Sequence, residues 1–403
     1  MGIFSGNKKS DKLMLVFDIG SSSVGGALFR TGETGTPKII KVVREPIALR
    51  ETLNIDEFLS STLKTLDAVA GKIHKGGAGA PKAVFAVLSS PWHVSQMRIV
   101  RMEKNTPFIF TSKLADSLIQ KEIALFEEYL VKYLDKSPVQ TIEFKNIKTM
   151  LNGYETPNPL NQKVKELEMT IFFSTSGEQV LKKIKEIVGK YFHARDIRFS
   201  SFTLASFAVI RDFFTYNEDF LLIDIDGEVT DISLSKKNLL RESVSFPFGS
   251  NFIARAAASS FGVPIVEAKS LISLFNEGHA EEVTAQKIGQ VMDQLRKDWL
   301  AKFQESLVNL SNDISVPSTI YLAVDKENAD FFKKTIENEQ FHQYTLAESK
   351  FKVIFLNAEV FHGMAGFDEN AVRDPRLIID SIYINRFLIN SVHSAAALEP
   401  AQK

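Results

Sequence analysis

The stretch LMLVFDIGSSSVGGALFR, Leu13–Arg30, holds two apolar runs joined by an acid, a glycine and three serines. The runs Met14–Phe17 and Val24–Phe29 predict a β-hairpin with a polar tip. Gly20 allows the backbone to approach closely, and the N–H groups and hydroxyls of such a tip can receive phosphate oxygens. Asp18 could hold Mg²⁺ through water. The alternative is an ordinary hairpin closed by small residues.

A second stretch, FLLIDIDGEVTDISL at Phe220–Leu234, repeats this pattern. An apolar strand ends at Asp224, a turn contains Gly227 and Thr230, and Asp231 opens the returning strand. Two such hairpins, one in each half of the chain, indicate a duplicated fold with a site between the halves.

Composition narrows the class of protein. The chain has 403 residues, enough for two or more domains of ~100–200 residues each. A hydrophobic content of 44% with 24% charged residues is ordinary for a globular protein, and the net charge of -1 gives no bulk attraction to nucleic acid. The absence of cysteine excludes disulfides and thiolate sites. No apolar run approaches the ~18 residues of a membrane span, and the N-terminus lacks a signal-peptide pattern, so we expect a cytoplasmic protein.

The order of the predicted elements suggests two lobes with an insertion. The first ~90 residues are predicted as β-β-β-α-β, a typical α/β unit. The region after Trp92 then has the pattern of a small α+β domain, and Trp92 and His93 themselves are expected to be packing or interface residues. The expected segments are the first lobe at 1–83, an inserted domain at 84–200, the second lobe at 201–262, a helical subdomain at 263–316, the rest of the second lobe at 317–392, and a polar tail at 393–403.

The two hairpins, DIGSSS and DIDGEVTD, resemble the phosphate loops of the actin-like ATPase superfamily. Their order with the insertion, with LASFAVI and with SFPFGSNFIARAAASSFG is similar to that in FtsA of bacterial cell division and PilM of type IV pilus assembly. The segments LNGYETPNP and VKELEMTIFFS also look like FtsA. The resemblance implies an α/β, actin-like two-lobed fold of duplicated RNase H-like domains, with a small α+β domain inserted in the first lobe.

The resemblance also implies a MgATP site between the lobes. The residues that match the family's nucleotide-binding positions are Asp18, Gly20, Ser21, Ser22, Ser23, Asp224, Gly227, Thr230, Asp231, Gly249 and Ser250, with Asp18 and Asp224 on the metal side.

Several positions depart from the family's pattern. Asp226 and Glu228 replace glycines of the second loop, where they would repel a triphosphate and block close approach of the backbone. Lys269 and Ile272 stand where an acid and a lysine are expected, and TIYLAV runs into Asp325 instead of a glycine pair. We therefore expect weak or absent MgATP binding and, without a strong catalytic base, at most a weak ATPase.

Three functions remain open. The first is an FtsA-like scaffold of cell division, and the second is a PilM-like adaptor of pilus assembly. The third, a small-molecule kinase of the same superfamily, fits the motifs least. For the first two we expect bacterial division or pilus-assembly partners, self-association into filaments, and a place at the inner membrane face reached through partners, because the end SAAALEPAQK cannot bury an apolar face in lipid.

Overall fold

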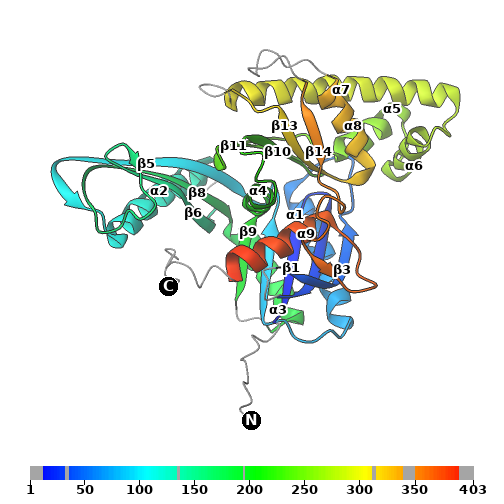
Figure 1. The fold of residues 1–403 in the computed structure, drawn as a ribbon. Coiled ribbons are helices and arrows are strands. Elements are labelled where there is room, and N and C mark those ends of the chain that lie inside the picture. Colours follow the sequence, from blue (N-terminus) through cyan, green and yellow to red (C-terminus); the bar gives the residue numbers. More distant parts are fainter. Residues whose placement is uncertain are drawn as a thin grey trace, which may run out of the picture.

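The computed structural model describes residues 12–31, 36–133, 137–193, 196–310, 315–338 and 350–389. These residues form three β-sheets (Figure 1). Two of the sheets are mixed sheets with helices on their faces, and we call these units the first and second lobes. The expected tail at 393–403 lies outside the described residues.

The first lobe is built on a six-stranded sheet in the order β15-β3-β2-β1-β4-β9. Side chains alternate along its central strand, so that Leu15 and Phe17 pack toward α1 and α3, whereas Met14 and Val16 pack toward α4 and α9. The sheet is therefore covered on both faces, as the apolar run of β1 predicts. Its elements are β1 (Leu13–Ile19), β2 (Ser23–Arg30), β3 (Lys38–Pro46), α1 (Ile55–Lys75), β4 (Ala83–Leu88), α3 (Glu178–Tyr191), β9 (Ile197–Ser201), α4 (Phe202–Phe213), β15 (Gly366–Phe367) and α9 (Pro375–Tyr383), which continues as the π-helical turn η1 (Ile384–Ile389).

The second lobe is built on a five-stranded sheet in the order β12-β11-β10-β13-β14. The long helix α7 crosses one face of it, at the top of Figure 1, and buries Trp299 against Phe303 at a ring distance of 5.0 Å. α5 and α6 lie at one end of this lobe. Its elements are β10 (Phe220–Ile225), β11 (Thr230–Lys236), β12 (Leu239–Phe246), α5 (Asn251–Phe261), α6 (Ile265–Asn276), α7 (Glu282–Leu310), β13 (Thr319–Val324), α8 (Lys326–Glu337) and β14 (Lys352–Phe355).

The third sheet, in the order β5-β8-β6-β7, projects to one side of the two lobes (Figure 1). We call it the inserted sheet, because its strands come between β4 and β9 in the chain. Helix α2 packs on one of its faces around Phe126 and Phe173, whose rings meet edge to face at 5.3 Å. Its elements are β5 (Val94–Ile109), α2 (Ser112–Tyr133), β6 (Val139–Leu151), β7 (Tyr154–Glu155) and β8 (Lys163–Gly177).

The inserted sheet is shorter in sequence than the segment 84–200 expected from the residues. β4 and β9 pair with each other in the sheet of the first lobe, and α3 packs against α1 of that lobe. An apolar strand such as β4 has the same local pattern in either sheet, so only the pairing of the strands decides where it belongs. The region 263–316 holds the helices α6 and α7, and α7 forms part of the core of the second lobe.

Glu143 joins the inserted sheet to the first lobe. Its Oε1 atom accepts hydrogen bonds from the backbone N–H of Ser201 at 3.0 Å, from the Ser201 hydroxyl, and from the Ser174 hydroxyl at 2.8 Å. Ser201 is also the N-cap of α4. The carboxylate of Glu143 therefore lies at the positive end of that helix. The junction is buried, and the Oε2 atom of Glu143 has no hydrogen-bond partner in the described residues.

No single helix among the described residues has both the length and the apolar composition needed to cross a membrane. Taken together, α5 and α6 meet that criterion as a pair bent by 103°.

Replacing Glu143 by Gln should flatten the pH dependence of stability. Burial raises the pKa of Glu143 from 4.5 to about 7, against the opposing effect of the hydrogen bonds from Ser201 and Ser174. The folded state therefore holds an extra proton between these two values. This group's contribution to the free energy of unfolding falls as pH rises through that window, by up to about 3 kcal/mol. Urea unfolding at a series of pH values measures the effect.

Glu128→Gln, on the exposed face of α2, is the matched control and should leave the pH dependence unchanged. An unchanged profile in Glu143→Gln would contradict the assignment.

Candidate functional site

The two hairpins predicted from the sequence form, and their tips face each other. β1 and β2 pair from Leu13 with Arg30 to Ile19 with Val24, and β10 and β11 pair from Phe220 with Ser235 to Ile225 with Thr230. We call residues 20–23 the first tip and residues 226–229 the second tip. The matching registers place Asp18 and Asp224 at equivalent positions in the two lobes.

The first tip binds a side chain of the second tip. The carboxylate of Asp226 accepts the backbone N–H of Ser21 at 2.7 Å and that of Ser22 at 2.9 Å. A Cβ atom on Gly20 would collide with the same carboxylate, so glycine is required at this position by the close approach of Asp226. The amides expected to receive phosphate oxygens are therefore already used by an acidic side chain of the same molecule.

Further contacts hold the two tips together. The backbone N–H of Glu228 donates to the hydroxyl of Ser21 at 3.0 Å. Trp92 is buried, as expected for a packing residue, and its Nε1 atom donates to the carbonyl of Gly20 at 2.8 Å. Its ring stacks on Phe58 at 5.0 Å, which anchors the first tip to α1.

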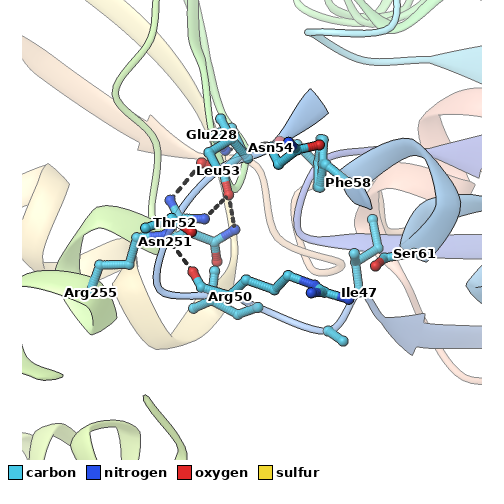
Figure 2. Close-up of a pocket in the computed structure, with 13 residues that line it drawn as sticks. Ile47, Arg50, Thr52, Leu53, Asn54, Phe58, Ser61, Glu228, Asn251 and Arg255 are labelled. Atoms are coloured by element: carbon cyan, nitrogen blue, oxygen red, sulfur yellow. Dashed lines mark hydrogen bonds and ion pairs between the residues drawn. The ribbon is translucent and has the colours of Figure 1, made fainter. Parts of the chain in front are cut away.

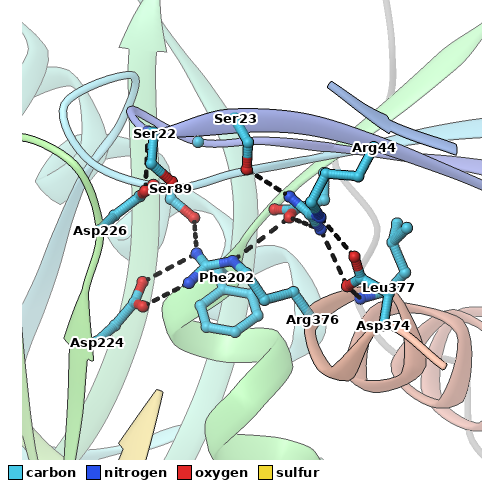
Figure 3. Close-up of polar contacts among 12 residues, drawn as sticks. Ser22, Ser23, Arg44, Ser89, Phe202, Asp224, Asp226, Asp374, Arg376 and Leu377 are labelled. Carbon is cyan, nitrogen blue, oxygen red and sulfur yellow. Dashed lines mark hydrogen bonds and ion pairs between the residues drawn. The ribbon is translucent and has the colours of Figure 1, made fainter. Parts of the chain in front are cut away.

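Arg376 lies at the centre of the site (Figure 3). Its guanidinium donates to both carboxylate oxygens of Asp224, at 2.7 and 3.2 Å, and lies 3.3 Å from Asp18. It also donates to the hydroxyl of Ser89 at 2.5 Å and lies 4.0 Å from the centre of the Phe202 ring. Asp18 and Asp224, the two carboxylates expected to hold a metal, therefore share one guanidinium.

A second arginine, Arg44 of β3, supports the first (Figure 3). It donates to Asp18 at 2.7 Å, to the Ser23 hydroxyl at 2.8 Å, and to both oxygens of Asp374 at 2.5 and 3.0 Å. Asp374 in turn accepts the N–H of Leu377 at 3.1 Å and so caps α9. The cap places Arg376 in the first turn of α9, facing the site.

The remaining expected site residues lie close by, but their side chains form hydrogen bonds with neighbouring residues of the fold. The hydroxyl of Thr230 donates to the carbonyl of Phe248 at 2.6 Å and accepts the indole N–H of Trp299 at 3.2 Å. Asp231 accepts the Ser90 hydroxyl at 2.9 Å and also that of Ser245.

The turn before α5 packs on the second tip. The N–H of Ser250 donates to the carbonyl of Asp226 at 2.8 Å. A Cβ atom on Gly249 would collide with the backbone of Asp226 and Gly227, and one on Gly227 would meet the backbone of Ser21. These residues thus lie around the site, with their backbones engaged in its packing.

The acidic groups of the site differ in how strongly they hold a proton. Burial raises the pKa of Asp224 to about 7, although Arg376 opposes it, and burial raises that of Asp231 to about 6. Burial also acts to raise the pKa of Asp226, but Arg376 and the hydrogen bonds from the first tip bring it below its ordinary value. Asp226 is therefore the carboxylate that stays charged in the tip-to-tip contact.

Glu228, expected to repel a triphosphate, has a charged partner. Its carboxylate pairs with Arg255 at 2.7 and 2.8 Å and accepts a hydrogen bond from Asn251 at 2.8 Å (Figure 2). The cavity beside these residues has a volume of about 10 Å³, the space of roughly one water molecule. Of the two acids in the second tip, only Asp226 occupies the place of a phosphate.

These side chains do not fit MgATP. The amides of the first tip are bonded to Asp226, and Arg376 lies between the two carboxylates expected on the metal side. Within the described ranges, no three His, Asp or Glu side chains are grouped so as to hold a metal ion.

Sequence reasoning identified both tips and Asp226, but it missed Arg44, Arg376 and Asp374. Arg44 is one basic residue in the strand KIIKVVREP, and Arg376 follows Pro375 at the start of a helix. Neither position carries a pattern that connects it with the hairpins. The only available signal was the Asp-Pro pair, which predicts a helix start and nothing about its target.

Comparison with known proteins gives the fold. No family model matches the chain, and no curated protein sequence matches it. A chain of the structure described as the PilM–PilN type IV pilus biogenesis complex is 14% identical, with a TM-score of 0.59, and the match covers 93% of this chain and 96% of that one.

Two further solved structures show weaker likeness. The ethanolamine utilization protein EutJ from Carboxydothermus hydrogenoformans is 11% identical, with a TM-score of 0.42 and coverage of 94% and 90%. A Bacteroides thetaiotaomicron protein with an actin-like ATPase fold is 10% identical, with a TM-score of 0.37 and coverage of 88% and 93%. The match to the pilus protein runs over nearly the whole chain. The chain has the actin-like ATPase fold, in a form divergent in sequence.

Proposed function

We propose that this protein is an adaptor of the PilM type, which acts through protein contacts and does not turn over nucleotide. The observation that carries the proposal is the carboxylate of Asp226 on the amides of the first tip, because it removes the place where a phosphate would bind. A small-molecule kinase needs that place, so the chemistry of the cleft does not support the third hypothesis.

The likeness in fold to a protein solved in complex with PilN supports a pilus-assembly partner over a division partner. The segments LNGYETPNP and VKELEMTIFFS form β7, β8 and the turn between β6 and β8, which belong to the inserted sheet. Their resemblance to FtsA keeps a division scaffold as the second candidate. In both cases the protein would work in the cytoplasm and reach the inner membrane face through its partner.

The inserted sheet offers a surface for such a partner. β5 is its edge strand and is long, so one row of its backbone groups is not used within the sheet. Ile99 lies on the face opposite α2, because its neighbour Val100 packs into the core beneath that helix. The side chain of Ile99 is 54% exposed. An exposed apolar residue beside an open strand edge suits an added strand from another protein.

Replacing Ile99 by Glu should weaken partner binding by about tenfold or more, the effect of losing one central apolar contact. Leu125→Glu is the matched control, because Leu125 is 51% exposed on α2, which covers the other face of the inserted sheet. The measurement is co-expression with pilus-assembly proteins and, separately, with division proteins encoded near this gene, followed by capture and titration. Equal binding by both variants would contradict the assigned surface, and capture of division proteins alone would favour the second candidate.

MgATP should bind too weakly to saturate wild-type protein at millimolar concentration. Asp226→Gly should raise the affinity by about tenfold or more, because it frees two amides and removes a negative charge from the phosphate position. Glu228→Gly alone should give little gain, since Arg255 already pairs with Glu228. Titration calorimetry of the three proteins tests this, and sub-micromolar binding by the wild type would contradict it.

We also propose that the protein associates with itself through head-to-tail contacts. Such contacts between identical molecules form open filaments unless the rotation closes a ring. Sedimentation at increasing protein concentration, with and without MgATP, should show larger species that do not depend on nucleotide. A protein that stays monomeric at high concentration would remove this part of the proposal.

A further inference from the structure

We propose that Asp226 and Arg376 take the places of a phosphate and a metal ion, and that they hold the two lobes closed in the absence of any ligand. In the related nucleotide-binding arrangement expected from the hairpins, an anion binds the tips and a cation binds the paired aspartates. Here both roles are filled by side chains of the same chain (Figure 3).

The carboxylate of Asp226, which belongs to the second lobe, binds backbone amides of the first lobe. Each oxygen of Asp226 accepts one backbone N–H of the first tip, and Oδ1 also accepts the N–H of Gly227 at 2.7 Å. Hydrogen bonds to an ionised acceptor are stronger than those between neutral groups. The carboxylate is 4% exposed, so these bonds are sheltered from water. Separating the lobes would break the two hydrogen bonds from Ser21 and Ser22 and would expose one buried charge.

The guanidinium of Arg376 also connects the two lobes. Arg376 lies on α9, which packs on the sheet of the first lobe, and its guanidinium contacts Ser89 and Asp18 of that lobe. The same guanidinium holds both oxygens of Asp224 in the second lobe. Removing one member of a buried ion pair leaves the other uncompensated, which makes such a contact costly to break.

A separate group of contacts links the lobes on the outer side of the tips (Figure 2). The segment between β3 and α1, residues 47–54, reaches across so that Leu49 packs against α5 and α6. The carbonyl of Arg50 accepts a hydrogen bond from Arg255 at 2.8 Å. Any test of the charged pair must distinguish it from this outer segment, and Leu49→Ala serves that purpose, because the apolar cluster that joins Leu49 to α5 and α6 includes no residue of the tips.

Chemical rescue by inorganic phosphate tests the proposal. In Asp226→Ala, amide hydrogen exchange at Ser21, Ser22 and Glu228 should accelerate by about tenfold or more in phosphate-free buffer, reflecting the lost charged hydrogen bonds. Millimolar phosphate should restore the slow exchange in this variant and change nothing in the wild type. Arg376→Gln should also accelerate exchange, without rescue by phosphate, because the missing group is a cation. Leu49→Ala should affect the outer segment alone.

Asp368→Ala, which breaks an exposed ion pair with Lys38, is the control for loss of a surface charge and should leave exchange unchanged. Slow exchange in phosphate-free Asp226→Ala would overturn the proposal, and so would acceleration that phosphate fails to reverse. If Asp226→Ala does not fold, judged by circular dichroism, the isosteric Asp226→Asn takes its place and should still accelerate exchange. Partner binding through Ile99 is measured on the wild type, so failure of this inference and failure of the adaptor function give different results.

Discussion

The structure of the cleft depends on the contact between the Asp226 carboxylate and the amides of the first tip. A carboxylate buried at this depth is tolerated only with several donors and a nearby cation, and both are present. The contact also dictates backbone geometry, because Gly20 must leave space for the carboxylate and Gly249 must lie directly on the second tip. The contact made by one acidic residue thus accounts for how closely the two hairpins meet.

Acidic side chains outnumber arginines in the cleft. Among the described residues, two guanidiniums, Arg44 and Arg376, face a larger number of carboxylates. Two of these acids, Asp226 and Asp374, have pKa values below the ordinary range, because the arginines and hydrogen bonds outweigh burial. Burial raises the pKa of Asp224, Asp231 and Asp380, which favours their neutral forms and lowers the negative charge that the two guanidiniums face. A cleft in this state has no surplus positive charge to offer a polyphosphate.

Local patterns in the sequence were enough to predict the hairpins, most helices and the two-lobed fold. Both tips lie between the strands predicted for the hairpins. The limits of the insertion were not predictable in this way, because β4 and α3 have patterns that fit either neighbour. Arg376 could not be found either, since 152 residues separate it from Asp224 and only the folded chain brings them together. Asp226 was recognised from its position as a repulsive charge, but its contact lies 205 residues away, in the other lobe.

A cleft occupied by its own side chains has a consequence for an adaptor. In a protein whose lobes close on a ligand, partner affinity falls with the fraction of molecules in the binding-competent arrangement. Here the tips, Arg376 and the segment 47–54 all favour one arrangement, and Glu143 fixes the inserted sheet to the first lobe within it. Under the proposed function, the partner surface at Ile99 is therefore preorganised, and binding does not require closure of the cleft. Under the same proposal, control of such an adaptor would rest on the availability of its partners and of further copies of the chain, and not on nucleotide.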